Sequence, residues 1–281
     1  METRPFPHPI RLLTYLSPGL PLAIFGAVAD HLRRWPGLGG PPITLASEER
    51  VSGPGRGSVG RSEDPFSRGE ADVGFLCAPT YLALRERERP PAGLLGIAPT
   101  FADERARGKP VYFCDVIVRR GSPAGSFWDL EGGAWAFNDP FSLSGLGGLS
   151  ARLGSPEEAG RFFGRTIRSG SHPASVRLVA GGMADAASID SNVLRILLEK
   201  NPALREELRV LESWGPYPIQ PVVVRAGLDR ALKAALRESL LNTDADPLTR
   251  MELGAFGLER FVAVGEEDYD AGRLPRPSAG T

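Results

Sequence analysis

The sequence contains little cysteine, little lysine and no long hydrophobic run. Its 281 residues include two cysteines, Cys77 and Cys114, with no Cys-x-x-Cys pair, which argues against a zinc site or a disulfide framework. Three of its 33 basic residues are lysine and the net charge is −1, so no basic field would attract nucleic acid or anionic lipid. No stretch reaches the roughly 18 apolar residues of a membrane-spanning helix. These shortages argue against a protein built on zinc or disulfides, a protein that binds nucleic acid or lipid through positive charge, and a protein with a membrane-spanning helix. They leave a globular chain.

Glycine and proline, by contrast, are plentiful. The chain has 34 glycines and 26 prolines, which predict many loops and short elements, as in α/β packing. Its length suits two lobes of roughly 100–150 residues each. Neither a Walker A motif nor a dinucleotide-binding fingerprint is present. We therefore expect no cofactor and no metal.

Hydrophobic patterning predicts an alternation of strands and helices. The first strand is expected at Ile10–Leu16, a helix at about 21–35, and a buried strand at Asp72–Cys77. Val111–Arg119 is the longest run typical of a strand, and residues 52–63 form the most loop-like stretch. Further strands are expected at 43–46 and 135–137, and helices from Ser144, at 156–168, at 172–181 and at 192–199.

Two segments far apart in the chain repeat one pattern. The run from Gly69 to Phe75 (GEADVGF) aligns with the run from Gly182 to Ser188 (GMADAAS). Each has a glycine after a helix, then an aspartate, then a strand. This predicts two lobes of related build, with Val111–Arg119 and Ile219–Arg225 as the segments that cross between them. We expect lobe 1 to comprise residues 1–114 and 218–281, lobe 2 to comprise residues 115–217, and a ligand to lie in the cleft.

The most informative segment for function is FNDPFSLSGLGG at 137–148. A strand ends here and leads into a glycine-rich helix start, where backbone N–H groups and the positive end of the helix dipole favour an anion. Ser142 and Ser144 add hydroxyl donors, and Gly145 allows a close approach to the backbone. The alternative interpretation is structural: a serine caps the helix and the glycines form a turn.

Four other residues are candidates for the same ligand. His172 begins a predicted helix and Asp190 ends a predicted strand, where it would accept a hydrogen bond from a protonated ligand oxygen and repel a fully deprotonated ligand. Tyr15 and Tyr81 follow the predicted strands of lobe 1. Three of them also have a structural alternative: His172 as a surface or satisfied histidine, Asp190 as a helix cap and Tyr81 as a buried tyrosine.

Four segments in the correct order resemble the PhnD-like phosphate, phosphite and phosphonate-binding family of ABC importers. They are GEADVGFLCAPTYL at 69–82, VYFCDVIVRRGSPAGSFWDLEGGAWAFNDPFSLSG at 111–145, SGSHPASVRLVAGGMADAASIDSNV at 169–193 and LERFVAVGEEDYD at 258–270. The resemblance implies the two-lobed type II periplasmic-binding-protein fold, an α/β fold in which each lobe is a mixed sheet flanked by helices and the ligand lies between the lobes.

The resemblance also implies a function and a ligand set. The chain would be a non-catalytic solute-binding protein that captures a small oxyanion or an organophosphonate for an ABC importer, with the transporter permease as its protein partner. Tyr81, Ser142, Ser144, Gly145, His172 and Asp190 would hold the ligand, and Tyr15 joins them on its position alone. Leu143 stands where the family's loop usually carries a hydroxyl, so the site is expected to be more apolar.

Two other functions remain open at this stage. One is a cytosolic enzyme on the same scaffold, as in the menaquinone pathway, with His172 or Asp190 as acid or base. The other is a ligand sensor that signals to a protein partner and uses Cys114 as a soft ligand.

The sequence also bears on location. Leu20–Ala29 imitates the hydrophobic region of an export signal but has no charged segment before it. We therefore expect a cytoplasmic monomer, with a periplasmic location as the alternative.

Overall fold

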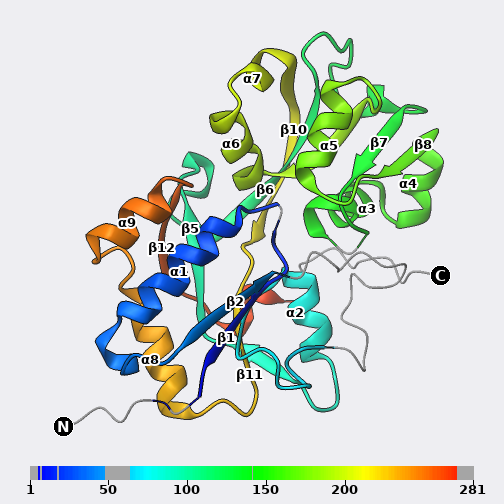
Figure 1. Cartoon of the computed structure of the whole chain (residues 1–281). Coiled ribbons are helices and arrows are strands. Elements are labelled where there is room, and N and C mark those ends of the chain that lie inside the picture. The colour runs from blue at the N-terminus through cyan, green and yellow to red at the C-terminus, as the bar shows by residue number, and fades with distance from the viewer. Residues whose placement is uncertain (1–5, 7, 18, 48–63, 141, 271–281) are drawn as a thin grey trace. The chain divides into compact units, whose positions relative to one another are not determined.

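The computed structural model describes residues 6, 8–17, 19–47, 64–140 and 142–270. The loop predicted at 52–63 lies outside the described residues. Contacts divide the described chain into two units (Figure 1). Unit 1 contains the residues up to Pro110 together with Pro218–Asp270, and unit 2 contains Val111–Tyr217. The first change of unit thus falls four residues before the boundary expected after residue 114.

Unit 1 is built on a mixed five-stranded sheet. Its order is β2 (Ile43–Ser47), β1 (Ile10–Thr14), β3 (Val73–Phe75), β11 (Val222–Arg225) and β4 (Ala92–Leu94). β1 runs parallel to β2 and β3, and β11 runs antiparallel to β3 and β4. Unit 1 also contains a two-stranded sheet of β5 (Ile97–Phe101) and β12 (Leu258–Ala263). The mixed α/β sheet agrees with the class of fold expected from the sequence.

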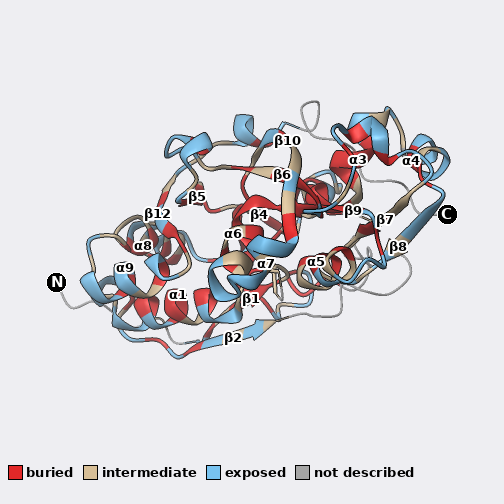
Figure 2. Ribbon diagram, turned by 90° about the horizontal axis from the view of Figure 1, so that it is seen from above, coloured by how far each residue is buried: buried red, intermediate tan, exposed pale blue. Residues whose placement is uncertain are grey.

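Four α-helices belong to the described part of unit 1: α1 (Leu22–Arg34), α2 (Ala78–Arg85), α8 (Arg230–Leu241) and α9 (Pro247–Gly254). Short 3₁₀ turns lie at Pro36–Leu38, Glu104–Ala106 and Glu266–Tyr269. The apolar run that imitates an export signal lies largely within α1, where Ile24, Phe25 and Val28 are buried. Exposed residues alternate with them along the helix (Figure 2). The apolar run is therefore the core-facing stripe of an amphipathic helix. No helix among the described residues is long and apolar enough to cross a membrane.

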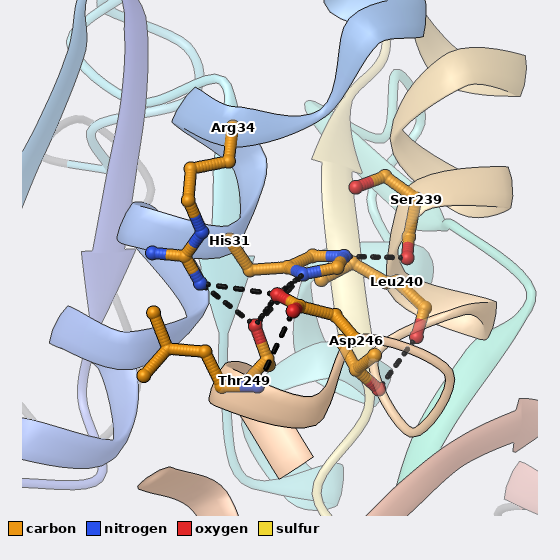
Figure 3. Close-up of polar contacts among 8 residues, drawn as sticks. His31, Arg34, Ser239, Leu240, Asp246 and Thr249 are labelled. Carbon is orange, nitrogen blue, oxygen red and sulfur yellow. Dashed lines mark hydrogen bonds and ion pairs between the residues drawn. The ribbon is translucent and has the colours of Figure 1, made fainter. Parts of the chain in front are cut away.

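A buried histidine joins three helices of unit 1 (Figure 3). The Nε2 atom of His31 on α1 lies 2.9 Å from the carbonyl oxygen of Ser239 on α8, and its Nδ1 atom lies 2.9 Å from the hydroxyl of Thr249 on α9. Asp246 accepts hydrogen bonds from Thr249 and from Arg34. The hydrogen bond from the Thr249 hydroxyl is the main cause that holds the pKa of Asp246 below its usual range, and Arg34 and His31 act in the same direction. A polar network therefore fixes α1 against α8 and α9.

Unit 2 has a second mixed five-stranded sheet. Its order is β10 (Leu208–Pro218), β6 (Val111–Arg119), β9 (Ala186–Asp190), β7 (Ala134–Phe137) and β8 (Arg165–Arg168). β9 runs antiparallel to β6 and parallel to β7, and β7 runs parallel to β8. The second crossing segment was predicted wrongly at Ile219–Arg225. β11 stays within the sheet of unit 1, and the chain changes unit at the end of the long strand β10.

The α-helices in the described part of unit 2 are α3 (Gly148–Leu153), α4 (Pro156–Phe162), α5 (His172–Ala180), α6 (Ser191–Lys200) and α7 (Ala203–Glu207), and a 3₁₀ turn lies at Phe127–Leu130. The helix predicted at 156–168 is too long, because its second half forms β8. At Gly164 an added Cβ would lie 2.3 Å from the carbonyl oxygen of Gly132. The backbones therefore touch at the point where the chain leaves the helix and enters the sheet.

The core of unit 2 contains a cluster of aromatic side chains. Trp135 is fully buried, and its ring stacks on Trp214 with 6.1 Å between ring centroids. Phe127 packs edge to face against Trp214 and stacks on Phe162 at 5.1 Å. Each buried aromatic side chain removes a large apolar area from water, so this cluster is a main source of stability in unit 2.

The repeat predicted from the sequence is confirmed. In unit 1 the backbone N–H of Asp72 donates to Arg11 O, and the N–H of Arg11 donates to the Asp72 carboxylate. In unit 2 Asp185 and Ala134 form the same two bonds. The registers agree, with Leu12 opposite Val73 in unit 1 and Trp135 opposite Ala186 in unit 2.

The shared registers set up a correspondence between the strands of the two units. β1, β2, β3 and β11 correspond to β7, β8, β9 and β6, in the same order and the same directions. The glycine before each of the two aspartates, Gly69 and Gly182, has a positive φ, of 68° and 73°. The two units therefore share one topology, and a position in one can be matched to a position in the other.

Candidate functional site

The candidate site lies where β7 and β9 of unit 2 end and where α5 begins. We call this region the strand-end edge of unit 2, comprising residues 138–140, 142–145, 172 and 188–192. β7 and β9 are parallel, so the segments that follow them emerge on the same side of the sheet. α5 packs against both strands. The edge brings together the predicted residues Ser142, Ser144, Gly145, His172 and Asp190 within one unit.

The predicted helix from Ser144 begins as a π-helical turn at Leu143–Gly147 and continues as α3. The backbone N–H groups of Gly145 and Gly147 both donate to Ser142 O. A Cβ at Gly145 would lie 2.2 Å from Asn138 Oδ1 and 2.6 Å from Asp139 O. Only glycine fits at this position, because the loop folds directly over it. π-helical turns occur frequently at functional sites.

Two hydroxyls and an imidazole form a buried hydrogen-bonded chain. Ser144 Oγ lies 2.8 Å from His172 Nε2, and Ser142 Oγ lies 3.4 Å from Ser144 Oγ. Their exposed fractions are 7% for Ser142, 3% for Ser144 and 5% for His172. Burial lowers the pKa of His172 from its ordinary value to about 3. The imidazole is therefore neutral at physiological pH, and the three side chains form a polar but uncharged group.

Ser188 on β9 fixes the position of the π-helical turn. Its hydroxyl donates to Ser144 O at 2.7 Å and to Gly145 O at 3.0 Å, and the side chain is fully buried. Ser188 was not among the residues predicted from the sequence. The signal available for it was a hydroxyl residue in a strand of otherwise small and apolar residues, at the position that corresponds to Phe75 in the repeat. Ser188 acts through the turn and thereby positions Ser144.

Asp190 ends β9 and caps α6. Its Oδ1 atom accepts hydrogen bonds from the backbone N–H groups of Asn192 at 2.9 Å and Val193 at 3.4 Å. The side chain is 3% exposed. The structural interpretation of Asp190 as a helix cap is therefore confirmed. Its role toward a ligand stays a prediction.

Three polar atoms near the end of these strands are buried without a hydrogen-bond partner among the described residues. They are His172 Nδ1, Asn138 Oδ1 and Asn192 Nδ2. Buried polar atoms without partners are uncommon in folded proteins and carry a free-energy cost. Sequence analysis selected His172 but neither asparagine. Asn138 follows β7 directly, and this position was the signal available for it.

The two tyrosines predicted for the ligand set belong to unit 1. Tyr81 on α2 is fully buried, and its hydroxyl donates to the Glu266 carboxylate at 2.6 and 2.7 Å. Burial and the Glu266 carboxylate raise the pKa of Tyr81 above its usual range. Tyr15 follows β1 and is partly exposed, and its backbone N–H donates to Phe75 O. Within unit 1, the Tyr81 hydroxyl therefore already has a partner.

Cys114 on β6 lies opposite Asp190 in the register of β6 and β9. Its Sγ atom lies 3.9 Å from Leu143 O, and the residue is fully buried. Burial, followed by the charges of Asp190 and Asp115, raises the pKa of the thiol well above its ordinary value. Cys114 is therefore a protonated thiol beneath the π-helical turn. Among the described residues no group of three His, Cys, Asp or Glu side chains is arranged to hold a metal ion.

Solved structures with the same fold are two-lobed binding proteins. The structure of a binding-protein component of an ABC phosphonate transporter from Pseudomonas aeruginosa is 18% identical, with a TM-score of 0.75 over 93% of this chain and 83% of that chain. PhnD1 from Prochlorococcus marinus, solved with methylphosphonate, is 17% identical, with a TM-score of 0.74 over 94% of this chain and 96% of that one. A Xanthomonas citri protein solved with ATP is 19% identical, with a TM-score of 0.64 over 92% of each chain.

The family comparison covers most of the chain. Residues 58–269 match the family described as the periplasmic substrate-binding protein of the phosphonate ABC transporter. This match confirms the resemblance found in the sequence and overturns the cytoplasmic location predicted there; the periplasmic alternative fits. Proteins of this family bind small phosphonate ligands and work with a transporter permease. The chain belongs to the family of periplasmic substrate-binding proteins of phosphonate ABC transporters.

Proposed function

We propose that this chain binds a small phosphonate-type oxyanion at the strand-end edge of unit 2 and releases it unchanged to a transporter. The observation that carries the proposal is the buried chain formed by Ser142, Ser144 and His172 at the starts of two helices. Hydroxyl and imidazole N–H groups donate to anions, and the first backbone N–H groups of a helix favour negative charge.

Neutral donors suit a protein that must release its ligand. The pKa of His172 is lowered to about 3 by burial, so the imidazole brings no positive charge to the ligand at neutral pH. Affinity then comes from several directed hydrogen bonds, and their geometry selects the shape of the anion. Because Ser142, Ser144 and His172 are uncharged, these three donors bring no buried positive charge that would have to be desolvated.

The contacts favour binding over catalysis. Ser144 and His172 lie at the distance of a nucleophile and its general base, but within the part of the chain that the structure describes no carboxylate bonds His172 Nδ1 to orient the ring. An imidazole with a pKa of about 3 is also a weak base at neutral pH. Both features argue against an enzyme that uses this pair, and we propose that the chain has no turnover.

The contacts of Cys114 do not support the sensor alternative. A soft-ligand role needs a thiolate, whereas burial and two nearby carboxylates keep the pKa of this thiol high. The thiol lies against the main chain of the π-helical turn, at Leu143 O. Its packing is that of a small buried hydrophobic residue.

Tyr15 and Tyr81 stay in the proposed ligand set with different requirements. Tyr15 follows β1 of unit 1 at the position that corresponds to the residue after β7 of unit 2. Tyr81 would have to exchange Glu266 for the ligand, because that carboxylate already accepts the hydrogen bond of its hydroxyl. We also propose that the chain acts as a monomer and binds no nucleic acid, in keeping with its net charge of −1.

A thermal-shift and calorimetry screen with methylphosphonate, phosphite, phosphate and methanesulfonate tests the proposal. A ligand at about 100 times its Kd stabilises the folded state by about 2.7 kcal/mol, so at least one phosphorus oxyanion should raise Tm clearly. Phosphorus NMR of the mixture should show the ligand unchanged after prolonged incubation.

The matched variants are His172→Ala, which removes the imidazole of the site, and Cys77→Ala, which changes the residue of unit 1 that corresponds to Asp190. Loss of one hydrogen bond to a charged ligand costs about 1.5–3 kcal/mol, so His172→Ala should weaken binding roughly tenfold to a hundredfold. Cys77→Ala should leave affinity unchanged. Full affinity in His172→Ala, or conversion of the ligand, would contradict the proposal.

A further inference from the structure

Asn138 adds an uncharged acceptor to a site whose hydroxyl and imidazole groups can donate. It follows β7 directly, and its Oδ1 atom is buried with no hydrogen-bond partner among the described residues. The atom lies against the π-helical turn, at the place where an added Cβ on Gly145 would be only 2.2 Å away. The loop that carries Ser142 and Ser144 therefore folds over an amide oxygen whose hydrogen-bonding capacity is unused.

The candidate donors of the site and the Asn138 oxygen need different atoms of the ligand. Ser142, Ser144 and His172 offer hydrogen to the oxygen atoms of an anion. A side-chain carbonyl oxygen only accepts hydrogen bonds, so a ligand contacting Asn138 Oδ1 must itself carry a hydrogen on that side. Leaving a buried acceptor unpaired in the complex would cost affinity.

Asp190 was expected to perform this function, but its Oδ1 atom is already engaged. It accepts two backbone N–H groups at the start of α6. Asn138 Oδ1, in contrast, accepts no hydrogen bond from any of the described residues. Of the two residues, the asparagine offers the uncommitted acceptor.

The repeat places Asn138 at a position that was selected independently. Arg11 and Ala134 correspond through the bonds that each forms with its aspartate. Four residues further along each strand, Tyr15 in unit 1 corresponds to Asn138 in unit 2. Sequence analysis selected Tyr15 because ligand contacts in α/β folds gather at strand ends, and the same reasoning applies to Asn138.

From these observations we infer that Asn138 is a specificity-determining residue that accepts a hydrogen bond from a protonated oxygen of the bound anion. The inference rests on the proposed function and narrows its ligand class. The site takes oxyanions that keep a P–OH group, such as a phosphonate monoanion, and discriminates against sulfonates. A sulfonate is also tetrahedral and singly charged, but it carries no hydrogen for Asn138 Oδ1.

Calorimetry with methylphosphonate and methanesulfonate on the full chain tests this inference. The two ligands share shape and, for the phosphonate monoanion, charge, so their main difference is the P–OH donor. The wild-type chain should bind methylphosphonate at least about tenfold more tightly, the effect of one good hydrogen bond. In Asn138→Leu, which keeps the side-chain size without hydrogen-bonding atoms, methylphosphonate affinity should fall about tenfold while methanesulfonate affinity is unchanged.

Controls keep the test decisive. Asn201→Leu changes an exposed asparagine at the end of α6 and should preserve the preference of the wild-type chain. Asn138→Ala serves as a second variant, checked by circular dichroism, in case leucine disturbs the loop. Equal wild-type affinities for the two ligands, or an unchanged preference in both Asn138 variants, would overturn the inference and leave the proposed function standing. No binding of any phosphorus oxyanion would overturn both.

Discussion

The two units share one sheet topology and use it differently. Where the strands begin, both have the same exchange of hydrogen bonds between an aspartate and the neighbouring strand. Where the strands end, unit 2 has Asn138, Ser188 and Asp190, and the corresponding residues of unit 1 are Tyr15, Phe75 and Cys77. The shared half of the repeat builds the sheet, and the divergent half supplies the candidate donors and acceptors.

The units also differ in what holds their helices. Unit 1 relies on the polar network of His31, Asp246 and Thr249, whereas unit 2 relies on the cluster around Trp135 and Trp214. Charged and hydrogen-bonded contacts respond to pH and salt, and apolar contacts respond mainly to temperature and denaturant. We therefore expect the two units to differ in their sensitivity to solution conditions.

The largest predicted effect concerns the two aspartates of the repeat. The side chain of Asp72 is 5% exposed and bonds the side chains of Arg11 and Arg225, whereas the carboxylate of Asp185 accepts a hydrogen bond from the backbone N–H of Ala134. Burial acts to raise the pKa of Asp72, and the hydrogen bonds from the two arginines outweigh it and lower the pKa. Asp72→Ala should reduce the free energy of unfolding by about 3 kcal/mol, and Asp185→Ala by about 1 kcal/mol, in urea denaturation.

The stability that Asp72 contributes depends on pH with a definite sign. A carboxylate with a lowered folded-state pKa stabilises the protein above its unfolded pKa, and that stability is lost as the pH falls through the folded value. The difference between the variants should therefore shrink in acid below about pH 4. Equal losses for Asp72→Ala and Asp185→Ala at neutral pH would break the comparison between the units.

A smaller effect is predicted for two glycines of unit 2. An added Cβ at Gly145 would meet Asn138 Oδ1 and Asp139 O, whereas at Gly160 on α4 nothing lies within 4 Å. Gly145→Ala should destabilise the protein by about 2 kcal/mol through overpacking. Gly160→Ala should be neutral or stabilising by up to about 1 kcal/mol, because alanine favours helix. Thermal unfolding of both variants measures the difference, and a stabilising Gly145→Ala would show that the turn has room.

The smallest predicted effect concerns His172, the buried histidine of unit 2, which is compared with an exposed histidine. The folded-state pKa of His172 is about 3, so the unfolded chain binds a proton at this residue in mild acid and the folded chain does not. Stability should therefore decrease as the pH falls, by about 1 kcal/mol between pH 7 and pH 5.5. His172→Gln should reduce this slope in ligand-free protein, and His8→Gln, an exposed change, should not. A slope unaffected by His172→Gln would mean that other groups titrate.

Local pattern was enough to predict much of the fold. Val111–Arg119 was predicted with the observed bounds, and the helices at 172–181 and 192–199 differ from α5 and α6 by a single residue at their ends. β8 was missed because its residues continue the polar pattern of α4, and the chain turns where Gly164 packs against the backbone of Gly132. Contacts between distant segments are not written in local periodicity.

The candidate site was predicted in the same uneven way. Sequence position identified the end of β7 and the start of α5, and the structure joins them through Ser144 and His172. The hydroxyl of Ser188 and the Asn138 oxygen were missed because their importance depends on the π-helical turn that folds over β9. The partner of Tyr81 was also missed, because Glu266 lies 185 residues away in the chain.

Because of where the tryptophans lie, the intrinsic spectroscopic signals of the protein report mainly on one unit. Of the four tryptophans in the chain, Trp128, Trp135 and Trp214 belong to unit 2 and Trp35 belongs to unit 1. Intrinsic fluorescence is thus weighted toward the unit that holds the π-helical turn, and the stacked indoles of Trp135 and Trp214 should produce a near-ultraviolet dichroism signal that disappears when that unit alone loses its packing.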